Sequence, residues 1–150
     1  MYTIRRAVPA DVEGLVALCD QIHDAGVCTS VPISHQDSGT FAKAMIESPI
    51  GAFFVAEKDG ELAAAVGLLV VPYHWNFSIK LAQGVLLWAN PQYRGAGHRA
   101  LIAAEAWAKS QGAHKIMLTT NDTIPHATNS RAYFERRGYV PEETNYMRSL

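Results

Sequence analysis

The residues best suited to chemistry form a short glycine-containing segment, Gln92-Tyr93-Arg94-Gly95-Ala96-Gly97-His98. It lies between a predicted strand and a predicted helix. The first amides of a helix have no acceptor within the helix, and the aligned peptide dipoles add partial positive charge there. Glycines let the chain approach an anion without a Cβ in the way. The segment therefore predicts a diphosphate-binding loop, with an ordinary glycine turn before a helix as the alternative.

Two arginines, one within this segment and one directly after it, add cationic side chains. Arg94 and Arg99 could pair directly with phosphate oxygens. The alternative is that both are solvated surface side chains. In either case we expect the backbone amides from Arg94 to Arg99, those of Ala96 and His98 included, to face the phosphates.

The rest of the sequence predicts the elements that position the loop. Helical spacing of apolar residues, strand-like runs and turn residues mark them. Strands are expected at Tyr2–Arg6, Phe53–Glu57, Glu61–Val71, Leu81–Ala89, Lys115–Thr119 and Tyr146–Arg148. Helices are expected from Pro9 to Ala25, over Gly39–Glu47 and His98–Gln111, and from a cap at Thr128 or Asn129 to Arg137.

Three connections complete this prediction. Lys58-Asp59-Gly60 indicates a tight hairpin turn, Gly84 indicates a β-bulge, and His74 to Ile79 is expected to be a loop. The order of elements predicts one α/β (mixed α+β) domain over residues 1–150. Its front half is antiparallel, and its back half contains a parallel strand–helix–strand crossover.

The glycine segment resembles the acyl-CoA loop of the GNAT superfamily of N-acetyltransferases, whose pattern is Gln/Arg-x-x-Gly-x-Gly/Ala. Gln92, Gly95 and Gly97 satisfy that pattern. Glu105-Ala106-Trp107-Ala108 followed by Gly112, and the stretch from Ala132 to Tyr139, are similar to two helices of the family. The resemblance extends over essentially the whole chain. It implies the acyl-CoA N-acyltransferase fold, acetyl-CoA as co-substrate, and direct acetyl transfer to a primary amine of a small metabolite, a peptide N-terminus or a lysine.

The same resemblance implies further contacts with the co-substrate. A backbone amide around Leu87-Trp88-Ala89 would contact the thioester carbonyl, and Asn121 and Asn129 would contact the pantetheine. The two asparagines could instead be turn or cap residues. No Gly-x-Ser-x-Gly elbow is present, in agreement with transfer that forms no acyl-enzyme.

The sequence departs from the family pattern in two places. If the loop is aligned on its proline and Arg94, it is two residues short relative to Trp107 and Gly112, and Arg99 falls where the last Gly/Ala is expected. Alignment on Gln92 removes this conflict and moves the gap upstream; we favour that alignment, with Gln92, Gly95 and Gly97. The second departure is Phe134, which stands where the family often has a tyrosine that protonates the leaving thiolate. Tyr133 is the neighbouring candidate, although one step along a helix turns a side chain by about 100°. A packed core tyrosine is the alternative.

The general base is not marked by a motif. The strand from Gly84 to Ala89 has no carboxylate, where many relatives carry one. His74 and His126 are candidates, since both are expected in loops near the cleft and histidine titrates near neutral pH. Plain loop histidines, with a base acting through ordered water, are the alternative.

Charge and composition exclude several classes of protein. The formal net charge of −1 argues against a nucleic-acid binder, although residues 1–75 carry four Lys/Arg against nine Asp/Glu and residues 76–150 carry nine against five. Cys19, Cys28 and the six histidines show no metal-ligand spacing, so no metal is expected and both cysteines are interpreted as reduced thiols. The sequence contains no Gly-x-Gly-x-x-Gly loop, which argues against a dinucleotide-binding fold.

The apolar runs and the two ends of the sequence bear on location and assembly. No apolar run is long enough for a membrane span and no secretory signal is visible, which predicts a cytoplasmic protein without a membrane partner. A C-terminal strand could pair across a homodimer. The alternative function, from another class, is a catalytically silent acyl-CoA-binding sensor.

Overall fold

The structure is a computed structural model that describes residues 1–27, 29–121 and 127–150. Cys28 and His126 therefore lie outside the described residues. The chain divides into two compact units, residues 1–119 and residues 120–150, which are described separately. One domain over residues 1–150 stays a prediction.

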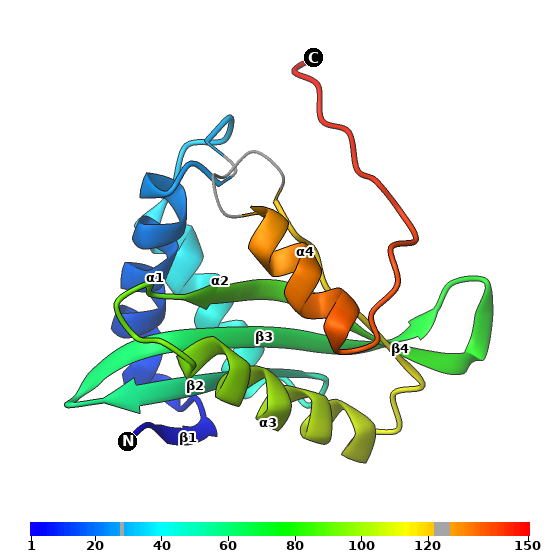
Figure 1. The fold of residues 1–150 in the computed structure, drawn as a ribbon, viewed down its shortest axis with the longest axis horizontal. Helices are drawn as coiled ribbons and strands as arrows, with labels where there is room; N and C mark the ends of the chain where they lie inside the picture. Colours follow the sequence, from blue (N-terminus) through cyan, green and yellow to red (C-terminus); the bar gives the residue numbers. More distant parts are fainter. Residues whose placement is uncertain (28, 122–126) are drawn as a thin grey trace. The chain divides into compact units, whose positions relative to one another are not determined.

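The first unit contains five strands and three α-helices. In order they are β1 (Thr3–Arg6), the single 3-10 turn η1 (Pro9–Asp11), α1 (Val12–Asp24), α2 (His35–Glu47), β2 (Gly51–Lys58), β3 (Glu61–Tyr73), β4 (Asn76–Ala89), α3 (Ala96–Ser110) and β5 (Lys115–Met117). The second unit contains α4 (Ala127–Arg136). Figure 1 shows the elements of each unit.

The strands form one sheet in the order β1-β2-β3-β4-β5. The first four pair antiparallel, and β4 and β5 pair parallel across the α3 crossover. The β2–β3 turn has Asp59 at φ 54° and Gly60 at φ 83°, the left-handed conformations that a two-residue hairpin turn requires. The predicted α/β fold, with its antiparallel front half and parallel crossover, is confirmed.

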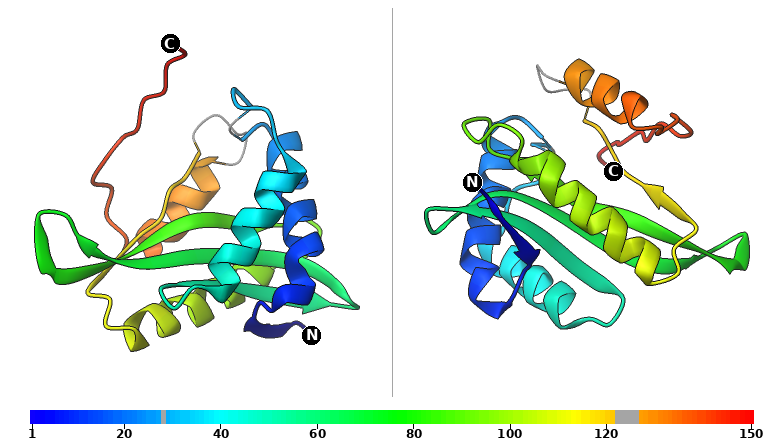
Figure 2. Two further views of the ribbon diagram at one scale, coloured as in Figure 1. Left: turned by 180° about the vertical axis from the view of Figure 1, so that it is seen from behind. Right: turned by 60° about the horizontal axis from the view of Figure 1, so that its bottom comes forward.

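Helices cover both faces of this sheet (Figure 2). Leu15 and Leu18 of α1 pack with Met45 of α2 on Phe53 and neighbouring side chains of the sheet. On the other face α3 buries a stripe of small and branched residues, among them Ala100, Leu101 and Ala104. Small alanines bring the α3 backbone close to the sheet, so the loop before α3 lies beside the end of β4.

The middle of β4 is irregular at the predicted position. Gly67 of β3 pairs with Leu86 and Leu68 pairs with Gly84, so Val85 is an extra residue in β4. A bulge next to Gly84 is thereby confirmed. At Gly84 the end of β5 comes very close, since an added Cβ would lie 3.1 Å from the Met117 carbonyl oxygen. Glycine is therefore needed where β5 reaches β4.

Several predicted boundaries were wrong. Helix α2 begins at His35 rather than Gly39, because the Ser34 hydroxyl caps it by accepting from the Asp37 amide. Helix α3 begins two residues before His98, at Ala96. The segment expected as a loop at His74 to Ile79 is mostly strand, because the hairpin continues to the pair Tyr73–Asn76.

The second unit also departs from expectation. Helix α4 begins at Ala127, so Thr128 and Asn129 lie within its first turn rather than at its cap. No strand forms over Tyr146–Arg148; residues 139–150 carry no regular secondary structure, and the Tyr146 side chain is 94% exposed. A strand needs a neighbour to satisfy its backbone groups, and no described strand pairs with this segment.

Candidate functional site

The loop between β4 and α3 is built on Asn90. The Asn90 amide continues the sheet by donating to the Ala63 carbonyl oxygen at 2.9 Å. Its side-chain oxygen accepts from the Gln92 amide at 3.0 Å, and its carbonyl oxygen accepts from the Tyr93 amide at 2.9 Å. This Asx turn reverses the chain within three residues and sends it into α3.

The loop uses some of its backbone donors internally. The Ala96 amide donates to the Tyr93 carbonyl oxygen and the Arg99 amide to the Gly95 carbonyl oxygen, both at 3.2 Å. The amides of Arg94, Gly95 and Gly97 donate to no residue that the structure describes. Gly95 is the N-cap of α3 at φ 85° and has no side chain with which to cap the helix. These three amides are therefore available to an external acceptor.

The surroundings of these amides favour an anion. They lie at the positive end of α3, a helix of 15 residues whose first turn holds no acidic side chain. Arg94 and Arg99 are exposed on either side of Gly95, as are Gln92 and His98. Ala96, by contrast, is fully buried, and its amide is already used, so we remove it from the expected contacts in this conformation.

The end of β4 provides a second set of backbone donors. Among the described residues, β5 pairs with β4 only over Leu81–Gln83, so the outer edge of Val85–Ala89 faces no described strand. The Asn90 amide points toward β3. Because donors alternate along an antiparallel strand, the amides of Leu87 and Ala89 point to the open edge and that of Trp88 points to β3.

The side chains here divide between the two faces of the sheet. The Trp88 indole donates to the Gln21 side-chain oxygen of α1 at 3.2 Å and packs on the α1–α2 core. Ala89 lies against Gly97 of α3 instead. The structure thus brings Leu87 and Ala89, with their outward amides, next to the glycine loop, while Trp88 serves packing.

His74 lies far from this loop. It forms the tip of the β3–β4 hairpin, between the rings of Tyr73 and Trp75 at 4.9 and 4.6 Å. Strand β4 has 14 residues, which separates its two ends by about 45 Å. Figure 1 shows the hairpin tip and the loop at opposite ends of the sheet. The expectation that His74 lies near the cleft was wrong, because the hairpin is longer than its sequence suggested.

Three predicted site residues belong to the second unit. Asn129 is exposed in the first turn of α4, and Asn121 precedes that helix and is half-buried. The Tyr133 ring lies 5.6 Å from that of Phe134 and 6.0 Å from the Arg137 guanidinium carbon. Their proposed roles toward the co-substrate stay predictions.

A groove of about 400 Å³ lies at the C-terminal end of α1. Ile22, Val27 and Ile33 line it with Cys19, and Asp37 of α2 adds a carboxylate. His23 also lines it, with a buried Nε2 that bonds to no described residue. The groove adjoins the end of α1 whose Gln21 holds Trp88 of β4. It was not apparent from sequence, because its residues belong to no motif.

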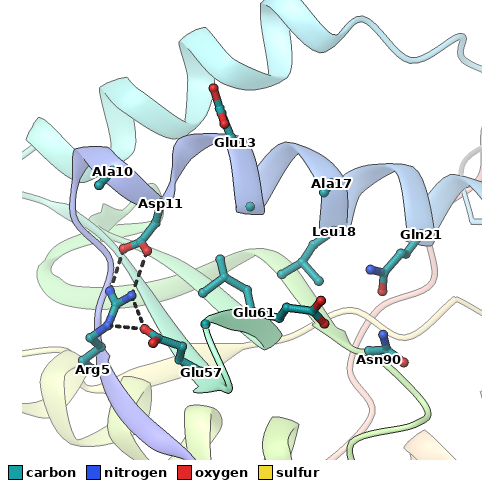
Figure 3. Close-up of a pocket in the computed structure, with 13 residues that line it drawn as sticks. Arg5, Ala10, Asp11, Glu13, Ala17, Leu18, Gln21, Glu57, Glu61 and Asn90 are labelled. Carbon is teal, nitrogen blue, oxygen red and sulfur yellow. Dashed lines mark hydrogen bonds and ion pairs between the residues drawn. The ribbon is translucent and has the colours of Figure 1, made fainter.

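A second cavity, of about 540 Å³, lies between α1 and the β2–β3 turn (Figure 3). Arg5 reaches into it, held by both oxygens of Asp11 at 2.6 and 2.8 Å and by Glu57 at 2.6 Å. Glu13 and Glu61 bring its carboxylates to four. This acidic wall disfavours a phosphate in this cavity.

Residues 1–27, 29–121 and 127–150 contain no group of three or more His, Cys, Asp or Glu side chains able to hold a metal ion. Within the same ranges, none of the helices has the length and apolar character needed to cross a membrane.

Comparison with known proteins places these features in context. Residues 20–139 match the profile of the acetyltransferase (GNAT) family. An uncharacterized N-acetyltransferase of Bacillus subtilis, YhfO, is 26% identical over 147 residues, with 96% of this chain and 93% of that protein covered. A provisionally assigned acetyltransferase of Agrobacterium tumefaciens is 26% identical with a TM-score of 0.75, over 99% of both chains. A protein of Clostridium acetobutylicum described as a predicted acetyltransferase, solved with acetyl-CoA, shares the fold at a TM-score of 0.74 and 18% identity, over 100% of this chain and 96% of that one.

Proposed function

The chain belongs to the GNAT family of acetyltransferases, and on that premise we propose that it transfers an acetyl group from acetyl-CoA directly to a primary amine. One observation carries the proposal. The amides of Arg94, Gly95 and Gly97, which donate to no described residue, lie at the start of α3 beside the open edge of β4. Diphosphate donors and thioester donors are thus neighbours along one stretch of backbone.

The residues present fit such a co-substrate. The loop amides would bind its diphosphate, with Arg94 and Arg99 contributing charge at the rim. The outward amides of Leu87 and Ala89 would donate to the thioester carbonyl oxygen, where negative charge develops during acyl transfer. Binding along this edge holds the thioester in place for an amine, which supplies much of the rate advantage.

Direct transfer is favoured over an intermediate bound to Cys19. Burial raises the pKa of the Cys19 thiol, and the neighbouring Asp20 carboxylate raises it further. A thiol that holds its proton is a poor nucleophile. In the proposed reaction the amine nitrogen bonds to the carbonyl carbon as the carbon–sulfur bond breaks, and the proton lost from nitrogen balances the proton that the thiolate gains.

The groove at the end of α1 is the proposed entry for the amine. Its Asp37 carboxylate suits a cationic acceptor, and its aliphatic wall suits a carbon chain. His23 replaces His74 as the candidate proton acceptor, because His23 lines this groove and His74 lies at the far end of β4. Small metabolites, peptide N-termini and lysine side chains all remain within this acceptor class.

An acceptor screen tests the proposal. Purified protein is incubated with acetyl-CoA and a panel of amines, and release of the free CoA thiol is followed. We expect thiol release that depends on both substrates. Binding of CoA without thiol release across a broad panel would instead support a silent acyl-CoA sensor, and absence of CoA binding would contradict both functions.

A further inference from the structure

Two tyrosines brace the glycine loop from outside. The Tyr2 hydroxyl, just before β1, donates to the Arg94 carbonyl oxygen at 3.0 Å. The Tyr2 ring meets the Tyr93 ring edge to face, with centroids 6.5 Å apart and planes at 86°. The Tyr93 hydroxyl in turn donates to the Glu61 carboxylate at 3.0 Å. The loop is therefore tied to the start of the chain and to the first residue of β3.

The Tyr2 hydrogen bond fixes the direction of one peptide group. In a trans peptide the carbonyl oxygen and the following N–H point to opposite sides, and no cis peptide occurs among the described residues. Holding the Arg94 carbonyl toward Tyr2 therefore directs the Gly95 N–H away from Tyr2. That N–H is the N-cap amide of α3 and donates to no described residue.

The position of this bond matters because Gly95 is a glycine. At φ 85° it occupies a conformation that only glycine adopts readily, and glycine also rotates readily to other conformations. Without the Tyr2 bond, the Arg94–Gly95 peptide could turn over. Its carbonyl oxygen would then face the anion site, where it would repel a phosphate instead of donating to it.

We propose that Tyr2 is a positioning residue for the diphosphate, acting through the Arg94–Gly95 peptide, with Tyr93 and Glu61 holding Tyr2 in place. This inference rests on the proposed function. Tyr2 touches no co-substrate itself; it keeps the Gly95 donor aimed outward. Neither its type nor its place in the sequence marks it, since it lies 92 residues from its partner.

Two charged side chains, those of Glu61 and Lys58, hold the Tyr93 ring in place. Hydrogen bonding to the Glu61 carboxylate raises the pKa of Tyr93, because the bond favours the protonated hydroxyl. The Lys58 ammonium lies 5.8 Å from the centre of the Tyr93 ring, on the other side of the β2–β3 turn, within cation–π distance. Both contacts fix the ring that Tyr2 packs against.

The variant Tyr2→Phe tests the inference, because it removes the hydroxyl and keeps the ring contact. We expect CoA binding, measured by titration calorimetry, to weaken about 3- to 10-fold, the range of one lost hydrogen bond. S-acetylpantetheine lacks the diphosphate, so kcat/KM with that donor should match the wild-type value. Tyr73→Phe, a hydroxyl deletion on the distant hairpin, is the matched control and should leave both measurements unchanged.

The outcomes separate this inference from the proposed function. If wild-type protein binds no CoA, the function itself fails. If the wild-type protein binds CoA and Tyr2→Phe binds CoA with the same affinity, only the positioning role is overturned. The same holds if Tyr2→Phe lowers kcat/KM with S-acetylpantetheine by as much as it weakens CoA binding. Tyr93→Phe, which cuts the link to Glu61, serves as a second variant should Tyr2→Phe not fold, and is expected to weaken CoA binding selectively in the same way.

Discussion

Gly97 of α3 lies directly against Ala89 at the end of β4. A Cβ added to Gly97 would stand 2.9 Å from the Ala89 Cβ, closer than two such carbons approach in proteins. The missing side chain therefore lets the first turn of the helix touch the strand. This contact places the two sets of backbone donors, those of the loop and those of β4, side by side.

The substitution Gly97→Ala should push the first turn of α3 away from the end of β4 and destabilise the fold. Helix propensity alone favours alanine over glycine by about 1 kcal/mol. We expect the clash with Ala89 to outweigh that gain and to lower the free energy of unfolding by about 1 kcal/mol or more. Urea unfolding measures it. The double variant Gly97→Ala/Ala89→Gly removes the clashing methyl and should recover much of the loss; a more stable single variant would contradict the contact.

Removing the two loop arginines should affect the co-substrate first. In Arg94→Ala/Arg99→Ala we expect the KM for acetyl-CoA to rise about tenfold while the relative KM values of different amines stay the same. The rise should shrink as ionic strength increases, because both side chains are exposed. A changed amine preference with an unchanged acetyl-CoA KM would place these arginines at the acceptor instead.

The two described histidine candidates make opposite predictions. His23→Gln should lower kcat at least tenfold if His23 accepts the amine proton, with a smaller change in the acetyl-CoA KM. His74→Gln should stay within twofold of wild type, because His74 lies at the far end of β4. Steady-state kinetics across a pH range compare them. Unchanged kcat in His23→Gln would assign the proton to water or to another group.

Asp11 should make stability depend on acid pH. Its hydrogen bonds from Arg5 hold the pKa of its carboxyl below the usual range, as does its bond from the Val8 amide, and the buried oxygens oppose this only partly. A lowered folded-state pKa stabilises the fold above about pH 4, the unfolded value, and that contribution is lost as the pH falls further.

The isosteric variant Asp11→Asn isolates this effect. At pH 7 its free energy of unfolding should be about 2 kcal/mol lower than that of the wild type, because charge-assisted hydrogen bonds are lost. The difference should narrow below pH 4. Urea unfolding at several pH values measures both curves. If the free energies of unfolding of the two proteins differ by the same amount down to pH 3, ionisation of Asp11 does not contribute to the pH dependence of stability.

The sequence was most informative where local geometry and chemistry coincide. The glycine loop could be found because a helix start and a conformation restricted to glycine both leave marks on residue type. The Asp59-Gly60 turn and the bulge beside Gly84 were found for the same reason. The role of Asn90 was not predicted, because an asparagine after a strand is compatible with many kinds of turn.

Features that depend on contacts between residues far apart in the sequence could not be predicted from the sequence. The length of the β3–β4 hairpin depends on cross-strand pairing between Tyr73 and Asn76, and this moved His74 away from the site. Tyr2, just before β1, and Glu61 of β3 reach the loop from distant parts of the sequence, and the α1 groove is formed by residues without a motif. Tertiary pairing, not local preference, decides all three.

The central claim is that the amides of Arg94, Gly95 and Gly97, which donate to no described residue, bind a diphosphate. Amide NMR of ¹⁵N-labelled protein titrated with CoA, and separately with pantetheine, tests it most directly. We predict large downfield shifts of the Gly95 and Gly97 amide protons with CoA and little change at these residues with pantetheine. Saturable CoA binding that leaves these two amides unmoved would contradict the account.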